Sequence, residues 1–155
     1  MASEPQPSPR LLVPPVYFVV ALLLMVFFHR VAPWVQVLEA PYRYAGIVVA
    51  VIGLGLGAWA AALFRRAGTN IRPFMPSSAL VVAGPYKLTR NPMYLGMAGI
   101  LLGAAIFMGS LTPFAVIPAF MALIAERFIL PEEAKLEAAF GRDYLDYKTR
   151  VRRWL

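Results

Sequence analysis

Long apolar stretches separated by short polar segments dominate the chain. Four of these stretches approach the ~20 residues that a helix needs to cross the hydrocarbon core of a bilayer. They cover residues 11–28, 44–64, 92–108 and 112–130. Gly109, Ser110 and Pro113 favour a tight turn between the last two, so these two form a helical hairpin. The pattern predicts an all-α integral membrane protein with four transmembrane helices.

The segments outside these spans are polar. Residues 1–10 contain three prolines and predict a disordered tail, which leaves residues 11–155 as one membrane domain. In the tail 131–155, Glu132 and Glu133 suit the positive end of a helix dipole, and Gly141 suits a C-terminal cap. Apolar residues follow at helical spacing and predict a cytosolic amphipathic helix whose apolar stripe lies on the membrane or against the bundle. They are Leu136, Phe140, Tyr144, Tyr147, Val151 and Trp154.

Charge supports a membrane location and gives an orientation. The chain is 60% hydrophobic, more than a soluble protein of 155 residues can bury, and its net charge is +7. Residues 65–90 carry five basic side chains and no acidic one, and the tail after residue 130 is also basic. The positive-inside rule therefore predicts that both termini lie in the cytoplasm. Such loops suit an anionic leaflet, with Lys148, Arg150, Arg152 and Arg153 facing lipid phosphates, and we expect no nucleic-acid partner.

Several kinds of chemistry lack the residues that they need. Cysteine is absent and His29 is the only histidine, so we expect no disulfide, thiolate nucleophile or metal centre. A hydrolase and a kinase are poorly supported, because the chain offers no Ser-His-Asp set, metal cluster or phosphate loop, and a carrier is poorly supported, because the spans hold almost no polar side chain. The glycines of residues 53–57 lie within a span with no strand before them, which excludes a nucleotide loop. Small residues at Gly53 and Gly57, or at Gly99 and Gly103, indicate close helix packing instead.

Two polar patches bracket the predicted hairpin, and together they indicate a site at the membrane surface. Residues 84–96 form the first patch and residues 131–133 the second. Methyl transfer from S-adenosylmethionine suits such a site, because it needs orientation and exclusion of water more than covalent help. The rings of Tyr86 and Tyr94 can stabilise a sulfonium, and Glu132 can bind ribose hydroxyls or an amino group. The residues are also compatible with interfacial aromatics and a helix-start carboxylate, so they do not select this reaction.

A resemblance to a known family favours methyl transfer from S-adenosylmethionine. The central motif of the isoprenylcysteine carboxyl methyltransferase family resembles Gly84-Pro85-Tyr86 followed by Arg90-Asn91-Pro92-Met93-Tyr94-Leu95-Gly96. Its C-terminal motif resembles Pro131-Glu132-Glu133 followed by Phe140-Gly141-Arg142-Asp143-Tyr144, Tyr147 and Arg150-Val151-Arg152-Arg153-Trp154. This family and the phospholipid methyltransferases form a superfamily of integral-membrane enzymes. The likeness covers about residues 70–155, just over half of the chain.

The resemblance implies an S-adenosylmethionine pocket at the cytosolic ends of the last helices, with a lipophilic substrate arriving from the bilayer. The implied cofactor contacts are Ser78, Ala79, Leu80, Val81, Tyr86, Asn91, Pro92, Met93, Tyr94 and Glu132. Arg90 and Arg127 are weaker candidates on the substrate side, and Arg90 is favoured as a positive-inside anchor. Transfer would be direct, so no catalytic residue is assigned.

Two departures from the family pattern leave the methyl acceptor open. Asn91 stands where the enzymes on prenylated proteins usually have histidine, and Phe128 stands where they have an arginine for the substrate carboxylate. A prenylcysteine carboxylate, a phospholipid amine and a small lipophilic molecule all stay as acceptors. The rival hypotheses are a non-catalytic membrane scaffold with the same fold and a small carrier. The oligomeric state is not predicted.

Overall fold

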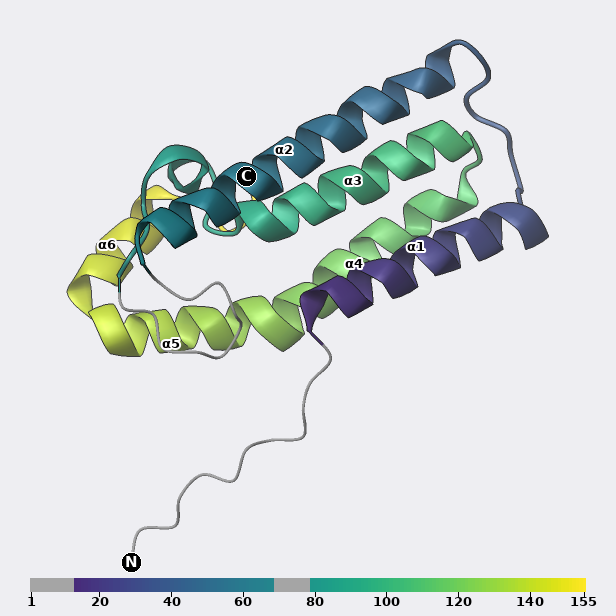
Figure 1. The fold of residues 1–155 in the computed structure, drawn as a ribbon. Helices are drawn as coiled ribbons and strands as arrows, with labels where there is room; N and C mark the ends of the chain where they lie inside the picture. The colour runs from purple at the N-terminus through teal and green to yellow at the C-terminus, as the bar shows by residue number, and fades with distance from the viewer. Residues whose placement is uncertain (1–12, 69–78) are drawn as a thin grey trace, which may run out of the picture.

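The computed structural model describes residues 13–68 and 79–155, which fold into a bundle of helices (Figure 1). Helices α2 and α3 lie side by side in one layer, and α1 and α4 lie side by side in the other (Figure 1). The helices are α1 (Pro14–Val31), α2 (Ala45–Arg66), α3 (Pro92–Met108), α4 (Val116–Ile124), α5 (Leu130–Phe140) and α6 (Arg142–Arg150). Short 3-10 turns cover Tyr42–Tyr44, Gly84–Lys87 and Thr112–Ala115, and a π-helical turn covers Ala125–Ile129.

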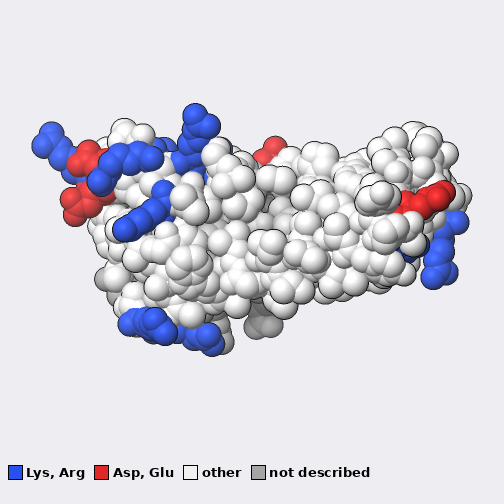
Figure 2. All heavy atoms as spheres, turned by 90° about the horizontal axis from the view of Figure 1, so that it is seen from above, with Lys and Arg blue, Asp and Glu red and all other residues white. Residues whose placement is uncertain are grey.

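Within the described residues, three segments are long and apolar enough to cross a membrane. They are Pro14–Val31, Tyr42–Arg66 and Thr112–Phe140, while α3 is apolar but has 17 residues. The outer faces of these segments expose large apolar side chains. For example, Leu23 is 64% exposed and Ile52 is 65% exposed. Charged side chains gather mainly at the two ends of the molecule, with an uncharged band between them (Figure 2). The fold is therefore that of a helical membrane protein, as the apolar pattern predicts.

The ends of α3 match the predicted span because the sequence fixes both of them. Pro92 occupies the first helical turn, where its missing N–H is not needed. Gly109 ends the helix in the left-handed conformation, with φ of 80°, and donates its N–H to the carbonyl oxygen of Ala105. The next helix then runs back toward the start of α3 (Figure 1). Helix α1 begins at Pro14, three residues later than predicted, and Pro14 again lies in the first turn.

The predicted tail helix has Pro131 in its first turn, but no break separates it from the fourth span, because one helical segment runs from Thr112 to Phe140. A proline inside an α-helix normally removes one hydrogen bond and clashes with the carbonyl four residues earlier. Here the wide π-helical turn Ala125–Ile129 comes directly before it, and Leu130 donates to Ala125, five residues back. The π turn accommodates Pro131, so α5 continues the fourth span.

The predicted single amphipathic helix in the tail is instead two helices. Gly141 ends α5 with φ of 52° and donates to the carbonyl oxygen of Glu137, and α6 begins at the next residue. The predicted apolar stripe is therefore folded onto itself. Tyr144, Tyr147 and Val151 are buried together, with Leu136 and Phe140 packed on them, so this part of the stripe lies against the bundle, one of its two expected positions.

Glycines bring α2 and α3 into close contact, as predicted for Gly53. A Cβ atom on Gly53 would lie 2.7 Å from the carbonyl oxygen of Gly96, and one on Gly96 would lie 2.6 Å from that of Gly53. Gly46 and Gly103 meet in the same way two turns further along. The sequence analysis did not single out Gly46 or Gly96. Because the two backbones touch, α2 holds the start of α3 rigidly in place.

At the far end of the bundle, a hydrogen bond ties α1 to the turn between α3 and α4. The Nδ1 atom of His29 lies 2.6 Å from the hydroxyl oxygen of Ser110, which is fully buried. His29 therefore lies in the last turn of α1 and has a structural partner in Ser110.

Candidate functional site

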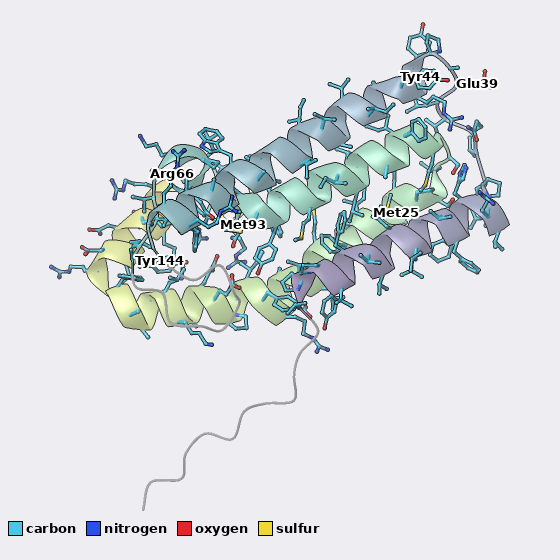
Figure 3. All side chains as sticks on the ribbon, viewed as in Figure 1. Met25, Glu39, Tyr44, Arg66, Met93 and Tyr144 are labelled. Atoms are coloured by element: carbon cyan, nitrogen blue, oxygen red, sulfur yellow. The ribbon has the colours of Figure 1, made fainter. Side chains whose placement is uncertain are left out.

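The two polar patches of the sequence meet at one end of the bundle. The end of α2, the turn before α3, the start of α5 and all of α6 gather there (Figure 1). Arg66, Met93 and Tyr144 lie at this end, whereas Glu39 and Tyr44 lie at the other (Figure 3). Most of the charged side chains are also found here (Figure 2).

A hydrogen bond joins the first patch directly to the second. The hydroxyl of Tyr94, in the first turn of α3, donates to Oε1 of Glu132, at the start of α5, over 2.9 Å. Tyr94 is 8% exposed, and Glu132 is half-buried. The bond uses one carboxylate oxygen, so Oε2 can accept a hydrogen bond from a ligand. The sequence analysis predicted both residues for one site, and the structure brings them together.

Tyr86 lies beside this pair and is held from two sides. Its ring packs against Phe64 of α2 with centroids 5.3 Å apart, and its carbonyl oxygen accepts a hydrogen bond of 2.6 Å from the Tyr147 hydroxyl. Burial, and then the neighbouring Tyr147 and Glu132, raise the pKa of the Tyr86 hydroxyl. Burial, followed by Tyr144, likewise raises the pKa of Tyr147. Both phenols therefore keep their protons at neutral pH, and Tyr147 can donate.

Replacing Tyr147 with phenylalanine should lower the free energy of unfolding by about 1 kcal/mol, because the change leaves a buried carbonyl oxygen without its donor. Thermal unfolding in detergent measures the effect. Tyr42→Phe is the control, since Tyr42 is 73% exposed. Equal melting temperatures for the two variants would show that the hydrogen bond to Tyr86 contributes nothing.

Glu133, the residue after Glu132, holds two arginines. Nε and Nη2 of Arg153 donate to its two carboxylate oxygens over 3.0 and 2.9 Å, and Nη1 of Arg90 lies 3.1 Å from Oε1. The side chains of Arg90 and Glu133 are 9% and 7% exposed. Hydrogen bonds to Glu133 raise the pKa of Arg153. Arg90, expected as a positive-inside anchor, and Arg153, expected to face lipid phosphates, are thus both paired with one buried carboxylate.

The polypeptide after α6 docks on the turn before α3. The Arg90 N–H donates to the Arg152 carbonyl oxygen over 2.9 Å. The carbonyl oxygen of Arg153 accepts from the Thr89 hydroxyl at 3.0 Å and from Nδ2 of Asn91 at 3.1 Å. The side-chain amide of Asn91, a predicted cofactor contact, thus binds the chain itself.

The other predicted cofactor contacts lie in the segments on either side of Tyr86 and at the start of α3. Pro92 and Met93 begin α3, with Pro92 buried and Met93 half-buried. Leu80 packs on the cluster of Tyr144, Tyr147 and Val151, and Ala79 and Val81 flank it. Ser78 lies outside the described residues.

Two further positions bear on the substrate side. Arg127, a weaker substrate candidate, is exposed on the π-helical turn. Phe128 is fully buried, with its ring edge-on to Tyr17 at 5.4 Å. Phe128 therefore belongs to the core between α1 and the fourth span.

Sequence reasoning missed the roles of Glu133, Thr89 and Arg153. One signal was present, since neighbouring helix residues point about 100° apart, so Glu132 and Glu133 need different partners. The arginine that Glu133 binds at the C-terminal end is 20 residues away. Nothing in the local pattern identifies such a partner.

Comparison with known proteins places this arrangement in a family. The family profile described as phospholipid methyltransferase matches residues 41–143, about two thirds of the chain. An uncharacterized protein of Haemophilus influenzae (strain ATCC 51907 / DSM 11121 / KW20 / Rd) is 38% identical over 63 residues, which are 41% of this chain and all of that protein.

The fold also resembles a solved structure of the eukaryotic intramembrane Ras methyltransferase, an isoprenylcysteine carboxyl methyltransferase. The TM-score is 0.63 at 24% identity, and the match covers 92% of this chain. The chain spans about half the length of that enzyme, with 50% of it covered.

The helical membrane fold, with its two polar patches joined at one end, defines a protein of the integral-membrane methyltransferase type. The chain belongs to the phospholipid methyltransferase family.

Proposed function

We propose that this protein is a methyltransferase that uses S-adenosylmethionine to methylate a lipophilic acceptor at the cytosolic face of the membrane. The observation that carries the proposal is the hydrogen bond of 2.9 Å between Tyr94 and Glu132. It joins the two polar patches into one site next to the apolar helices. Family membership supports the reaction class.

The residues present fit this cofactor. Oε2 of Glu132 offers an acceptor for ribose hydroxyls or for the amino group, and the rings of Tyr86 and Tyr94 offer faces that attract a cation. When bound, the cofactor would supply an activated methyl group. Residues 79–81, Asn91, Pro92 and Met93 would contribute shape and backbone groups around it, together with Ser78.

The chain's own contribution to the reaction would be orientation and a dry environment. Tyr94 and Tyr86 are buried, and Tyr94 covers one carboxylate oxygen of Glu132. Holding an acceptor in line with a methyl donor can supply ~7–11 kcal/mol of the barrier reduction. The site has no need of a covalent intermediate.

An apolar groove near this site would offer space for a lipophilic acceptor. An apolar groove of about 290 Å³ opens between α2, α3 and α4, and it includes Leu95, which lies one residue from Tyr94. We infer that an acyl, prenyl or other apolar chain would lie here. The groove is lined by Val49, Ile52, Gly53, Leu56, Leu95, Ala98, Gly99, Leu102, Ile117, Met121 and Leu155.

The proposed topology has four spans with both termini in the cytoplasm. Helix α3 would be the third span along the chain, because its 17 residues lie at the lower limit for crossing a bilayer. The end of the bundle with most basic side chains would face the cytoplasm and its anionic lipids.

Among acceptors, we favour a phospholipid amine or a small lipophilic molecule over a prenylcysteine carboxylate. The position that resembles the arginine for a substrate carboxylate is Phe128, buried in the core. Arg127, the neighbouring cation, lies on the exposed side of the same turn.

Methyl transfer can be tested with isotopically labelled S-adenosylmethionine. Membranes that contain the protein should incorporate label into the lipid or volatile fraction, and membranes that contain Glu132→Gln should incorporate at least tenfold less. Label in the protein fraction would instead indicate a protein acceptor. No label in any fraction above that of protein-free membranes would favour the scaffold hypothesis.

A further inference from the structure

Adjacent carboxylates at the start of α5 serve different partners. Glu132 accepts a hydrogen bond from Tyr94, whereas Glu133 binds Arg90 and Arg153. The Glu133 side chain is 7% exposed, so the carboxylate and Arg90 form a largely buried ion pair. A buried ion pair seldom adds much net stability, because desolvation offsets its attraction, but in some proteins it specifies one arrangement of the chain.

The arrangement that Glu133 specifies is a clasp between two distant segments. Residues 151–154 follow α6, and residues 89–91 precede α3. Besides the ion pairs, three hydrogen bonds of 2.9–3.1 Å connect the segments: Arg90 N–H to Arg152, and the Thr89 and Asn91 side chains to Arg153. Glu133 lies under both segments and binds an arginine from each.

This clasp is built into the frame of the proposed cofactor site. Tyr94 lies four residues after Arg90, in the first turn of α3. Glu132 and Glu133 are consecutive residues of α5. Tyr86 is held by Tyr147 of α6, the helix that leads into the docked segment. A shift of the clasp by 1 Å would therefore move all three proposed cofactor contacts relative to one another.

We propose that Glu133 is a positioning residue, which locks residues 89–91 to residues 151–154 and thereby sets the spacing of Tyr86, Tyr94 and Glu132 for the cofactor. The inference rests on the proposed function. It assigns Glu133 no contact with the cofactor. It differs from a role in stability alone, because it requires a change in cofactor affinity in a protein that stays folded.

The test compares Glu133→Gln with Glu137→Gln, a matched control on the same helix. Glu137 also pairs with a cation, Lys148 at 3.1 Å, but both side chains are well exposed, at 44% and 37%. Hydrogen exchange is followed at the Arg90 amide and neighbouring amides, and S-adenosylmethionine affinity is measured by titration in detergent. In Glu133→Gln, exchange at residues 89–95 should rise at least tenfold and the Kd should rise at least tenfold. In Glu137→Gln, both should stay within twofold of the wild type.

If the Glu133→Gln variant does not fold, Arg153→Gln tests the same contact. The Arg153 side chain is 36% exposed and lies near the end of the described chain, so we expect this variant to fold. It should raise the Kd three- to tenfold. The variant that carries both Glu133→Gln and Arg153→Gln should raise the Kd for S-adenosylmethionine by less than the product of the two single effects, because both changes break the same clasp.

The outcomes separate this inference from the proposed function. Unchanged exchange and a Kd within twofold of wild type in both Glu133→Gln and Arg153→Gln would overturn the positioning role. Multiplicative effects of the two changes would also overturn it. A wild-type protein that binds no cofactor would overturn the proposed function and the positioning role together. In that case, a comparison of hydrogen exchange at residues 89–95 between wild type and Glu133→Gln would still show whether the clasp forms.

Discussion

Replacing Gly53 with alanine is expected to lower the free energy of unfolding by about 3 kcal/mol, because a new methyl group would overpack the contact between two helix backbones. The new Cβ atom would lie 2.7 Å from the carbonyl oxygen of Gly96 and 2.8 Å from the backbone nitrogen of Ile100. Neither is the movable end of a side chain. The helices α2 and α3 would have to separate, and the start of α3 carries Tyr94.

Gly55→Ala is the matched control for this prediction. Gly55 lies two residues further along the same helix, and a Cβ atom there would meet nothing within 4 Å. Alanine favours a helix over glycine by ~1 kcal/mol, so this variant should be as stable as wild type or slightly more stable. Thermal unfolding in detergent compares the two. If Gly53→Ala melts at the temperature of Gly55→Ala, the close contact of α2 with α3 is not present in the protein.

The second large effect is expected for Glu132→Gln, which should weaken S-adenosylmethionine binding at least tenfold, or ~1.4 kcal/mol. A hydrogen bond to a charged group contributes ~1.5–3 kcal/mol, more than one to a neutral amide. The amide oxygen of glutamine can still accept the Tyr94 hydroxyl, so the fold should be kept. The readouts are titration with the cofactor and the melting temperature without it.

Glu126→Gln controls for removal of a negative charge near the same membrane face. Glu126 lies on the π-helical turn and is exposed. Its replacement should leave the affinity within twofold of the wild type. Equal affinity of the Glu132→Gln variant and this control would remove Glu132 from the site.

The sequence predicts the parts of the fold that depend on local chemistry. Pro92 and Gly109 determine both ends of α3, because one fits only a first helical turn and the other adopts a left-handed conformation. The meeting of Tyr94 and Glu132 was also predictable, since a hairpin returns the chain to the same membrane face. A rule about nearby residues was sufficient for the ends of α3, whereas the pairing of Tyr94 with Glu132, 38 residues apart, followed from the order of the apolar segments.

Other features depend on distant contacts, and sequence reasoning failed on them. Pro131 looks like a helix start, but the π-helical turn before it lets the helix continue. Arg153 looks like a lipid-facing cation, yet it pairs with Glu133 because α6 folds back at Gly141. The fold-back decides which cations reach the buried carboxylate, and no periodicity in the tail encodes it.

Titration of the purified protein with S-adenosylmethionine by calorimetry in detergent tests the central claim most directly. The account predicts saturable binding with a micromolar Kd and one cofactor per chain. At a cofactor concentration of 100 times the Kd, binding should also stabilise the protein by ~2.7 kcal/mol. Absence of both binding heat and thermal protection at millimolar cofactor, in a protein that is folded by its helical signal, would contradict the account.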